Sequence, residues 1–481
     1  MESETRAAMN PAGSEDAAAN SVMVVGGGVA GMSAACALAD AGFRVTLLER
    51  RGYLGGRAAS YFHPGTGEVI DNCQHVLFGC CTNLIDFYKR LGVEDRIFWD
   101  RRMTLIEPGG RRSVLEPSKL PAPMHGLPAI LRAHCFSVAD KVALMVAMGS
   151  MLLHHRPTSG RSLLQWLKAH GQTAGAQSRF WELVIASALN ASLDQIDLAY
   201  AQKVIRELLL NSPEAGAMGM SRVPLSDLYA GTAEYLEARR GRLLHGRSVT
   251  GAEWDESARR WTVQCGKERL EAEHLVLALS FEAMAKLLPT MPESADAGGL
   301  QERLSKLTHQ PICSVHLWFD REITELDHAL LLDGEIHWMY HKSRWQPVRT
   351  GEGSYVELVI SASHKFAALP REEAIRRATK QLGEYFPAAK SARVVKSALV
   401  KEVRATFGVP PGIDAIRPGA ISPWPQCFLA GDWVQTGWPA TMEGAVRSGY
   451  LAAEALCRSV GDPRSILAAE LAATGWMRMF G

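Results

Sequence analysis

The chain has 481 residues, a formal net charge of +1, and 47% apolar and 21% charged residues. These values are ordinary for a globular protein with two or three domains, and they give no support for nucleic-acid binding, which usually needs a basic domain or face. The nine cysteines include no CxxC pair, so we expect reduced thiols and neither a disulfide framework nor a metal site.

The start of the chain is small, polar and acidic, without the basic and apolar regions of a signal peptide. We therefore expect residues 1–20 to be a disordered tail and the protein to stay in the cytoplasm. No later run reaches the roughly 18 consecutive apolar residues that a membrane-spanning helix needs.

A glycine-rich turn is the first strong motif. A short apolar strand at 22–25 runs into this turn, and an alanine-rich helix from 29 to about 41 follows. In a dinucleotide fold Gly26 allows the tight turn, Gly28 lets the backbone approach a pyrophosphate, and Gly31 lets the helix pack closely on the sheet. The first N–H groups of the helix would then face the phosphates.

A second apolar strand, 44–48, ends in Glu49. This residue follows the last glycine at close to the roughly 20-residue offset at which an acidic side chain accepts hydrogen bonds from the adenosine ribose. Strand, turn, helix, second strand and acid together predict a dinucleotide-binding unit. Its contacts would include Gly26, Gly28, Val29, Ala30, Gly31, Glu49 and Arg50.

Residues 106–214 have a helical pattern rich in Leu, Ala and Met, and they lack a glycine fingerprint. We interpret this region as a cap that carries substrate specificity, with helices expected at 127–155, 163–170 and 180–210. An apolar stretch at 141–153 precedes the basic residues His154, His155, Arg156 and Arg161. A buried helix with a solvated end is the favoured interpretation, and contact with a membrane surface is the alternative.

Strand-like patterns return after the cap. A small meander is expected from segments at 242–250, 261–265 and 274–279. Alternating apolar and polar residues then predict a second sheet, with strands at 312–319, 336–340 and 355–360.

The closing motif begins with an apolar strand at Cys427. This strand delivers Gly431 and Asp432 at its carboxyl end, where open α/β sheets bind ligands. A helix begins near Thr441, so its first N–H groups, around Met442, carry the positive end of the helix dipole. The two ends of the chain are therefore predicted to build one site.

Three segments, 24–58, 71–80 and 429–449, resemble the squalene-associated FAD-dependent desaturase-like proteins, which are hydroxysqualene dehydroxylases within the amine oxidase and carotenoid desaturase superfamily. The stretches Asp-Asn-Cys-Gln-His and GDWVQTGWPATMEGA carry the choice of family. The resemblance implies non-covalent FAD, bound also by Gly55, Gly56, Arg57, Val249, Gly431, Asp432 and Met442.

The resemblance also implies a reaction, the reductive removal of the hydroxyl group of hydroxysqualene to give squalene for hopanoid or sterol-like lipids. Partners would be a triterpene substrate, prenyl-transferring synthases, an external flavin reductant and the inner face of the cell membrane. The departing hydroxyl needs a proton donor, for which His75 and Glu443 are candidates. A histidine in a turn is more often structural, and Glu443 equally fits a carboxylate at a helix start.

One residue departs from the family pattern. The related flavoenzymes have a glycine where this chain has Cys73, and a cysteine adopts the positive φ that glycine allows only at a cost. Either the turn differs here or the position tolerates a side chain.

The implied fold is α/β, with a Rossmann-like FAD-binding domain of the two-dinucleotide-fold type and a mixed α+β substrate domain. We expect the FAD-binding domain to comprise 21–105, 215–285 and 396–460, the substrate domain to comprise 106–214 and 286–395, and residues 461–481 to form a C-terminal tail.

Two other functions stay open. A carotenoid desaturase of the phytoene type would use the same FAD in the oxidative direction, and a non-catalytic flavin-binding subunit of an isoprenoid assembly would do no chemistry. The products formed from candidate substrates distinguish all three.

Overall fold

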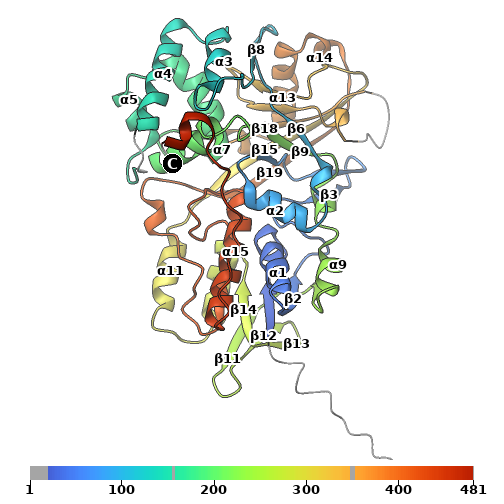
Figure 1. The fold of residues 1–481 in the computed structure, drawn as a ribbon. Helices are drawn as coiled ribbons and strands as arrows, with labels where there is room; N and C mark the ends of the chain where they lie inside the picture. The colour runs from blue at the N-terminus through green and yellow to red at the C-terminus, as the bar shows by residue number, and fades with distance from the viewer. Residues whose placement is uncertain (1–19, 154–157, 347–352, 480–481) are drawn as a thin grey trace, which may run out of the picture.

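A parallel sheet of five strands forms the centre of the first domain, the lower half of the molecule in Figure 1. The computed structural model describes residues 20–153, 158–346 and 353–479. In the order of the sheet, the strands are β10 (Arg242–His245), β2 (Arg44–Glu49), β1 (Ser21–Val25), β14 (His274–Leu277) and β20 (Cys427–Leu429). Strand β1 lies in the middle and is buried along its whole length, which suits its unbroken apolar sequence.

Helices from the two ends of the chain pack against each other beside this sheet. These are α1 (Val29–Asp40) and α15 (Met442–Ser459), which lie side by side in Figure 1. Their close packing depends on Gly449, where an added Cβ would lie 2.3 Å from the carbonyl oxygen of Ala30. The predicted unit of strand, turn, helix and strand is confirmed, as is the late helix. The other helices of this domain are α2 (Thr82–Arg90), α9 (Thr232–Glu237), α10 (Phe281–Leu287) and α11 (Ala297–Ser305).

Three small antiparallel sheets accompany the parallel one. One is a meander of β11 (Gly251–Asp255), β12 (Arg260–Cys265) and β13 (Glu268–Ala272), and of the three segments predicted for it only 261–265 belongs to it. The other two join the parallel sheet instead, because 242–245 form β10 beside β2 and 274–277 form β14 beside β1. The other two sheets are β3 (Ser60–His63) with β4 (Glu68–Asp71), and β5 (Val76–Phe78) with β9 (Met218–Ser221) and β6 (Ile97–Asp100).

A seven-stranded mixed sheet forms the centre of the second domain and confirms the predicted second sheet. In order, its strands are β19 (Val394–Phe407), β15 (His309–Phe319), β18 (Tyr355–Ile360), β17 (Trp338–Tyr340), β16 (His328–Leu331), β7 (Met103–Ile106) and β8 (Arg112–Leu115). Apolar residues of α13, such as Ala378 and Leu382, share a core with Val315 and Leu358 of the sheet. The helices beside it are α12 (His364–Ala367), α13 (Arg371–Tyr385) and α14 (Pro387–Ser391).

Two of the expected domain boundaries cut through strands of this sheet. The boundary at 105 falls inside β7, which pairs with β16, and the boundary at 396 falls inside β19, which pairs with β15. Because a strand contributes its hydrogen bonds to one sheet, all of β7 and β19 belongs with the second domain.

The cap consists of shorter helices than expected. The predicted helix at 180–210 is interrupted at Asn190, whose φ of +51° is left-handed, and helix resumes after Asp197, whose side chain accepts a hydrogen bond from Ala199 N–H. The predicted helix at 127–155 is likewise divided. The helical segments are α3 (Leu127–Arg132), α4 (Val138–Leu153), α5 (Leu163–Ala169), α6 (Ala174–Ala176), the π-helical η3 (Gln177–Ala186), α7 (Ser187–Leu189), α8 (Leu198–Val204) and the π-helical η4 (Ile205–Leu210).

The expected C-terminal tail lies against both domains. Glu454 accepts from the N–H groups of Ile466 and Leu467, and Trp476 N–H donates to the carbonyl oxygen of Ala122 at 2.9 Å. Met477 is fully buried. The short 3₁₀ turns of the chain are η1 (Glu94–Arg96), η2 (Met124–Gly126), η5 (Leu225–Leu228), η6 (Leu288–Thr290), η7 (Lys342–Arg344), η8 (Ile413–Ala415) and η9 (Gly475–Met479).

Candidate functional site

Two glycines of the first turn are required by close backbone packing. Gly26 has a φ of +113°, and an added Cβ would lie 2.4 Å from the carbonyl oxygen of Ala278, the residue after the neighbouring strand β14. A Cβ on Gly31 would lie 1.8 Å from the carbonyl oxygen of Gly26. Any side chain at either position would therefore push the turn away from the sheet, as the glycine pattern predicts.

Gly28 differs, because an added Cβ there would meet no described atom within 4 Å. This residue precedes α1, whose first turn carries the buried residues Val29 and Ala30. The second glycine pair lies beside it, with Gly55 N–H donating to Gly27 at 2.9 Å and a Cβ on Gly56 reaching 3.2 Å from Gly28 Cα. The open space at Gly28, at the start of a helix, fits a pyrophosphate.

Glu49 is 7% exposed and stands at the carboxyl end of β2. Its carboxylate accepts hydrogen bonds from Gly27 N–H at 2.7 Å and Arg51 N–H at 2.8 Å, so the acid is fixed against the glycine turn. The loop that carries Val249 starts beside it, because Arg247 N–H donates to the Glu49 carbonyl at 2.9 Å. The side chain of Arg50 is exposed to solvent. The acid and the loop thus border the predicted adenosine position.

The two chain ends meet in an ion pair between Arg57 and Asp432, with Arg57 Nη2 at 2.5 Å from Asp432 Oδ1. Asp432 follows Gly431, whose φ of +143° and close contact with the Trp433 indole leave no room for a side chain. The sequence predicts a flavin contact for each member of this pair, and the structure places the two together. About a third of the Arg57 side chain stays exposed.

Arg417 belongs to this site and has no signal in the sequence. Its buried guanidinium donates to four carbonyl oxygens of the 432–438 loop, those of Asp432 at 3.0 Å, Trp433 at 3.3 Å, Val434 at 2.5 Å and Trp438 at 2.8 Å. One arginine therefore fixes the loop that links the last strand to the last helix. A lone arginine between irregular segments forms no pattern that a sequence reader could use.

The last helix begins at Met442, as predicted. Thr441 caps it, since its hydroxyl oxygen accepts from Gly444 N–H at 3.0 Å, and Tyr88 O–H donates to the Met442 sulfur at 4.0 Å.

Glu443 is 1% exposed and contacts a different element from the one that carries it. Its two carboxylate oxygens accept from Asn83 Nδ2 at 2.9 Å and from Leu84 N–H at 2.8 Å, at the start of α2. Burial raises the pKa of Glu443, and the hydrogen bonds from Leu84 and Asn83 offset part of that rise. These contacts make it a carboxylate at the start of α2, a helix other than its own, and its proton-donor role stays a prediction.

His75 is half-buried, and its Nδ1 lies 2.8 Å from the carbonyl oxygen of Cys73. Burial lowers the pKa of His75, although the Cys73 carbonyl favours the protonated ring. Cys73 is buried, and its φ is not positive, so this turn accommodates the cysteine without backbone strain. The proton-donor role of His75 stays a prediction.

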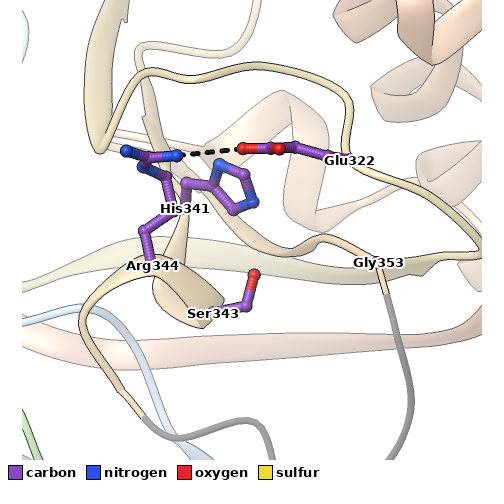
Figure 2. A pocket seen from close by; sticks show the side chains of 5 residues that line it. All are labelled: Glu322, His341, Ser343, Arg344 and Gly353. Carbon is purple, nitrogen blue, oxygen red and sulfur yellow. Dashed lines mark hydrogen bonds and ion pairs between the residues drawn. The ribbon is translucent and has the colours of Figure 1, made fainter.

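A hollow of about 380 Å³ lies apart from these residues (Figure 2). Its walls are polar, and Figure 2 shows the ion pair between Arg344 and Glu322, 2.9 Å long, across it. The residues that line it are Glu322, His341, Ser343, Arg344 and Gly353. None of them is a predicted cofactor contact.

Comparisons with known proteins agree with this geometry. The family model of flavin-containing amine oxidoreductases matches residues 29–457. A probable zeta-carotene desaturase of Synechococcus elongatus is 27% identical over 90% of this chain and 98% of its own length, and the 15-cis-phytoene desaturase of the same organism is 27% identical over 90% and 95%.

Solved structures show the same fold at low identity. Putrescine oxidase bound to putrescine has a TM-score of 0.69 at 16% identity and covers 91% of this chain and 99% of its own. Cyclohexylamine oxidase from Brevibacterium oxydans has a TM-score of 0.66 at 18% identity, covering 92% and 99%. The chain therefore belongs to the flavin-containing amine oxidoreductase family and is an FAD-dependent oxidoreductase of the amine oxidase and carotenoid desaturase type.

Proposed function

We propose that this flavoprotein desaturates a long isoprenoid hydrocarbon of the phytoene or zeta-carotene class. The observation that carries the proposal is the match to the zeta-carotene desaturase, which extends over 90% of this chain and 98% of that relative. It is one of the alternatives that the sequence leaves open, and it has better support than reductive dehydroxylation. Membership of an oxidoreductase family leaves the third alternative, a subunit without chemistry, without support.

Bound FAD would supply the two-electron acceptor that removal of hydrogen from a carbon chain requires. The chain's own residues would hold and orient it. The open space beside Gly28 would take the pyrophosphate, and Glu49, fixed by Gly27 N–H, would accept from the ribose hydroxyls. A substrate made of carbon and hydrogen offers no hydrogen-bonding group, so the shape of an apolar channel must orient it and exclude water.

Reductive dehydroxylation of hydroxysqualene is the second proposal, supported by the motif residues 71–75 and 431–445 and by the half-buried His75. The departing hydroxyl leaves as water only after protonation, so this reaction needs an acid that desaturation does not. Because burial lowers the pKa of His75, the protonated ring would give up its proton readily. Such an enzyme would also need an external flavin reductant and prenyl-transferring synthases that supply its substrate.

Product analysis with the purified FAD-loaded protein separates the two proposals. One set of reactions contains oxidised flavin, a quinone acceptor and phytoene or zeta-carotene, and the other contains chemically reduced flavin and hydroxysqualene without oxygen. A more conjugated polyene from the first set, with no squalene from the second, supports the desaturase. Squalene formed in step with flavin reoxidation, and lost in His75→Asn, would transfer the assignment to the dehydroxylase.

We also propose that α4 rests on a membrane surface, where such a substrate dissolves. Among the described residues no helix is long and apolar enough to cross a membrane. Yet α4 has an outward apolar face with Val138 79%, Val142 50%, Val146 54% and Leu153 69% exposed. Its other face, with Ala143 and Leu144, is buried, so the favoured prediction of a buried helix with a solvated end fits only this face. Of the basic cluster, residues 154–156 lie outside the described parts of the chain.

A further inference from the structure

A buried cation joins the second domain to the first. Lys342 lies on η7 and its side chain is 1% exposed. Its ammonium group makes an ion pair with Asp71 at the end of β4 and another with Glu357 of β18, 2.8 Å from Oε2. Removing three charges from water costs several kcal/mol for each ion unless every one is paired and hydrogen-bonded.

In both carboxylates of this network, the oxygen that does not face Lys342 accepts hydrogen bonds from the protein. Asp71 Oδ1 accepts from the Ser60 hydroxyl at 2.6 Å and from Leu225 N–H at 3.1 Å. Glu357 Oε1 accepts from the Ser314 hydroxyl at 2.6 Å. Burial alone would raise the pKa of Asp71, but the Lys342 ammonium and the hydrogen bonds from Ser60 and Leu225 together keep that pKa below its usual range. Each member thus has a fixed place.

The network continues into the cofactor site through the residue after Asp71. Asn72 donates from Nδ2 to the carbonyl oxygen of Arg57, and its N–H donates to the carbonyl oxygen of Ala59 at 3.0 Å. Arg57 in turn pairs with Asp432 at 2.5 Å. A continuous chain of hydrogen bonds, ion pairs and one peptide link therefore runs from the second sheet to the ion pair that joins the two chain ends.

The same 3₁₀ turn carries a second cation that faces outward. Arg344, two residues after Lys342, pairs with Asp327 at 2.5 Å and with Glu322 across the hollow of Figure 2. It has the same charge and sits on the same element, but its partners lie at the surface of the second domain. It is a natural control for Lys342.

We propose that Lys342 is a positioning residue for the cofactor, which sets the segment 71–75 and, through Asn72, the Arg57–Asp432 pair. The proposal concerns FAD binding and holds whichever substrate is turned over. Without Lys342 the buried carboxylates of Asp71 and Glu357 would lose the cation that they share, one of them would take up a proton, and the segment 71–75 would lose its anchor to the second sheet.

The test compares Lys342→Met, Asp71→Asn, the double variant and Arg344→Met. The affinity of each apoprotein for FAD is measured by titration, with the visible spectrum of the bound flavin and the unfolding temperature of the apoprotein recorded beside it. We expect about a tenfold rise of the FAD Kd and a changed spectrum in Lys342→Met and in Asp71→Asn. The double variant should be no weaker than the worse single one, because both changes remove one anchor.

Arg344→Met should bind FAD with the wild-type Kd. A Kd and spectrum within twofold of wild type in Lys342→Met, with only the unfolding temperature lowered, would reduce Lys342 to a structural role and overturn the proposal. If Lys342→Met does not fold, Asp71→Asn decides alone, because it keeps the Lys342–Glu357 pair and changes one oxygen of the side chain to nitrogen.

Discussion

At the scale of single residues, the cofactor site depends on polar side chains that each hold two pieces of backbone. Glu49 is the clearest case, because its two oxygens accept from Gly27 and Arg51 and leave further lone pairs for a ribose. We expect Glu49→Ala to weaken FAD binding by about 1.5–3 kcal/mol, which is roughly ten- to a hundredfold in Kd. Titration of the apoprotein with FAD measures this Kd, and Glu253→Ala, at an exposed position of β11, is the control. Equal affinities in both variants would contradict the assignment.

His337 makes stability depend on pH. Burial lowers its pKa from 6.5 to about 4, and its Nδ1 accepts from Ser361 N–H, which a protonated nitrogen could not do. The unfolded chain therefore binds the proton first, so the contribution is complete above pH 6.5 and is lost as the pH falls towards 4.

We expect this loss to reach up to about 3 kcal/mol of the free energy of unfolding. His337→Asn keeps an acceptor close to the same place without titrating. Urea unfolding at a series of pH values gives the free energy of unfolding as a function of pH. Below pH 6.5 this free energy should change less steeply with pH in His337→Asn than in wild type. The same pH dependence in both proteins would show that protonation of His337 does not destabilise the folded state.

At the scale of elements, α15 stabilises the start of α2, because the Glu443 carboxylate accepts hydrogen bonds there. Replacing this carboxylate leaves two buried N–H donors of α2 with a weaker acceptor, so Glu443→Gln should lose about 1–3 kcal/mol of stability while the folded fraction keeps its turnover per bound flavin. Glu454→Gln, on the same helix, is the comparison because that carboxylate holds the C-terminal tail instead. Wild-type stability with lost turnover would restore Glu443 as a proton donor.

The outward face of α4 predicts a second measurable property. Val142→Asp with Val146→Asp should abolish sedimentation with vesicles that contain anionic lipids, because charged side chains resist burial among acyl chains. The control places the same change at Val395 and Val403 of β19, which are exposed to similar extents, 48% and 55%. Arg161→Glu should weaken vesicle binding less than the two valine changes do. Its effect should be larger at low salt than at high salt, because salt screens surface charges. Sedimentation that survives the α4 change would place the contact elsewhere.

The elements also show what a sequence can reveal. The glycine turn and Glu49 were predictable because their spacing is local, and β1 because a strand buried on both faces is apolar throughout. The break at Asn190 was not, since one left-handed residue interrupts an apolar pattern without changing its period. Lys342 and Arg417 were not predictable either, because partners far away in the sequence determine their roles.

At the scale of the whole molecule, the described parts of the chain bury all nine cysteines. We expect the flavin to be non-covalent, since a covalent link would need a cysteine or histidine placed at the isoalloxazine ring. Precipitation of the protein with acid should leave the yellow colour in the supernatant. Flavin that stays with the pellet after washing in denaturant would show a covalent bond, and digestion of that pellet would identify the residue.

The pairing of α1 with α15 also bears on how the protein is made. Residue 40 leaves the ribosome about 400 residues before residue 442, and at roughly 5–20 residues per second that interval is about 20–80 seconds. During this time β1 and β2 have no β20 at the far edge of their sheet, and the surface that α15 covers stays open. The nascent chain thus carries an exposed apolar helix until translation is nearly complete, so chaperone binding should fall on α1, and any stop codon before residue 427 should leave an insoluble product.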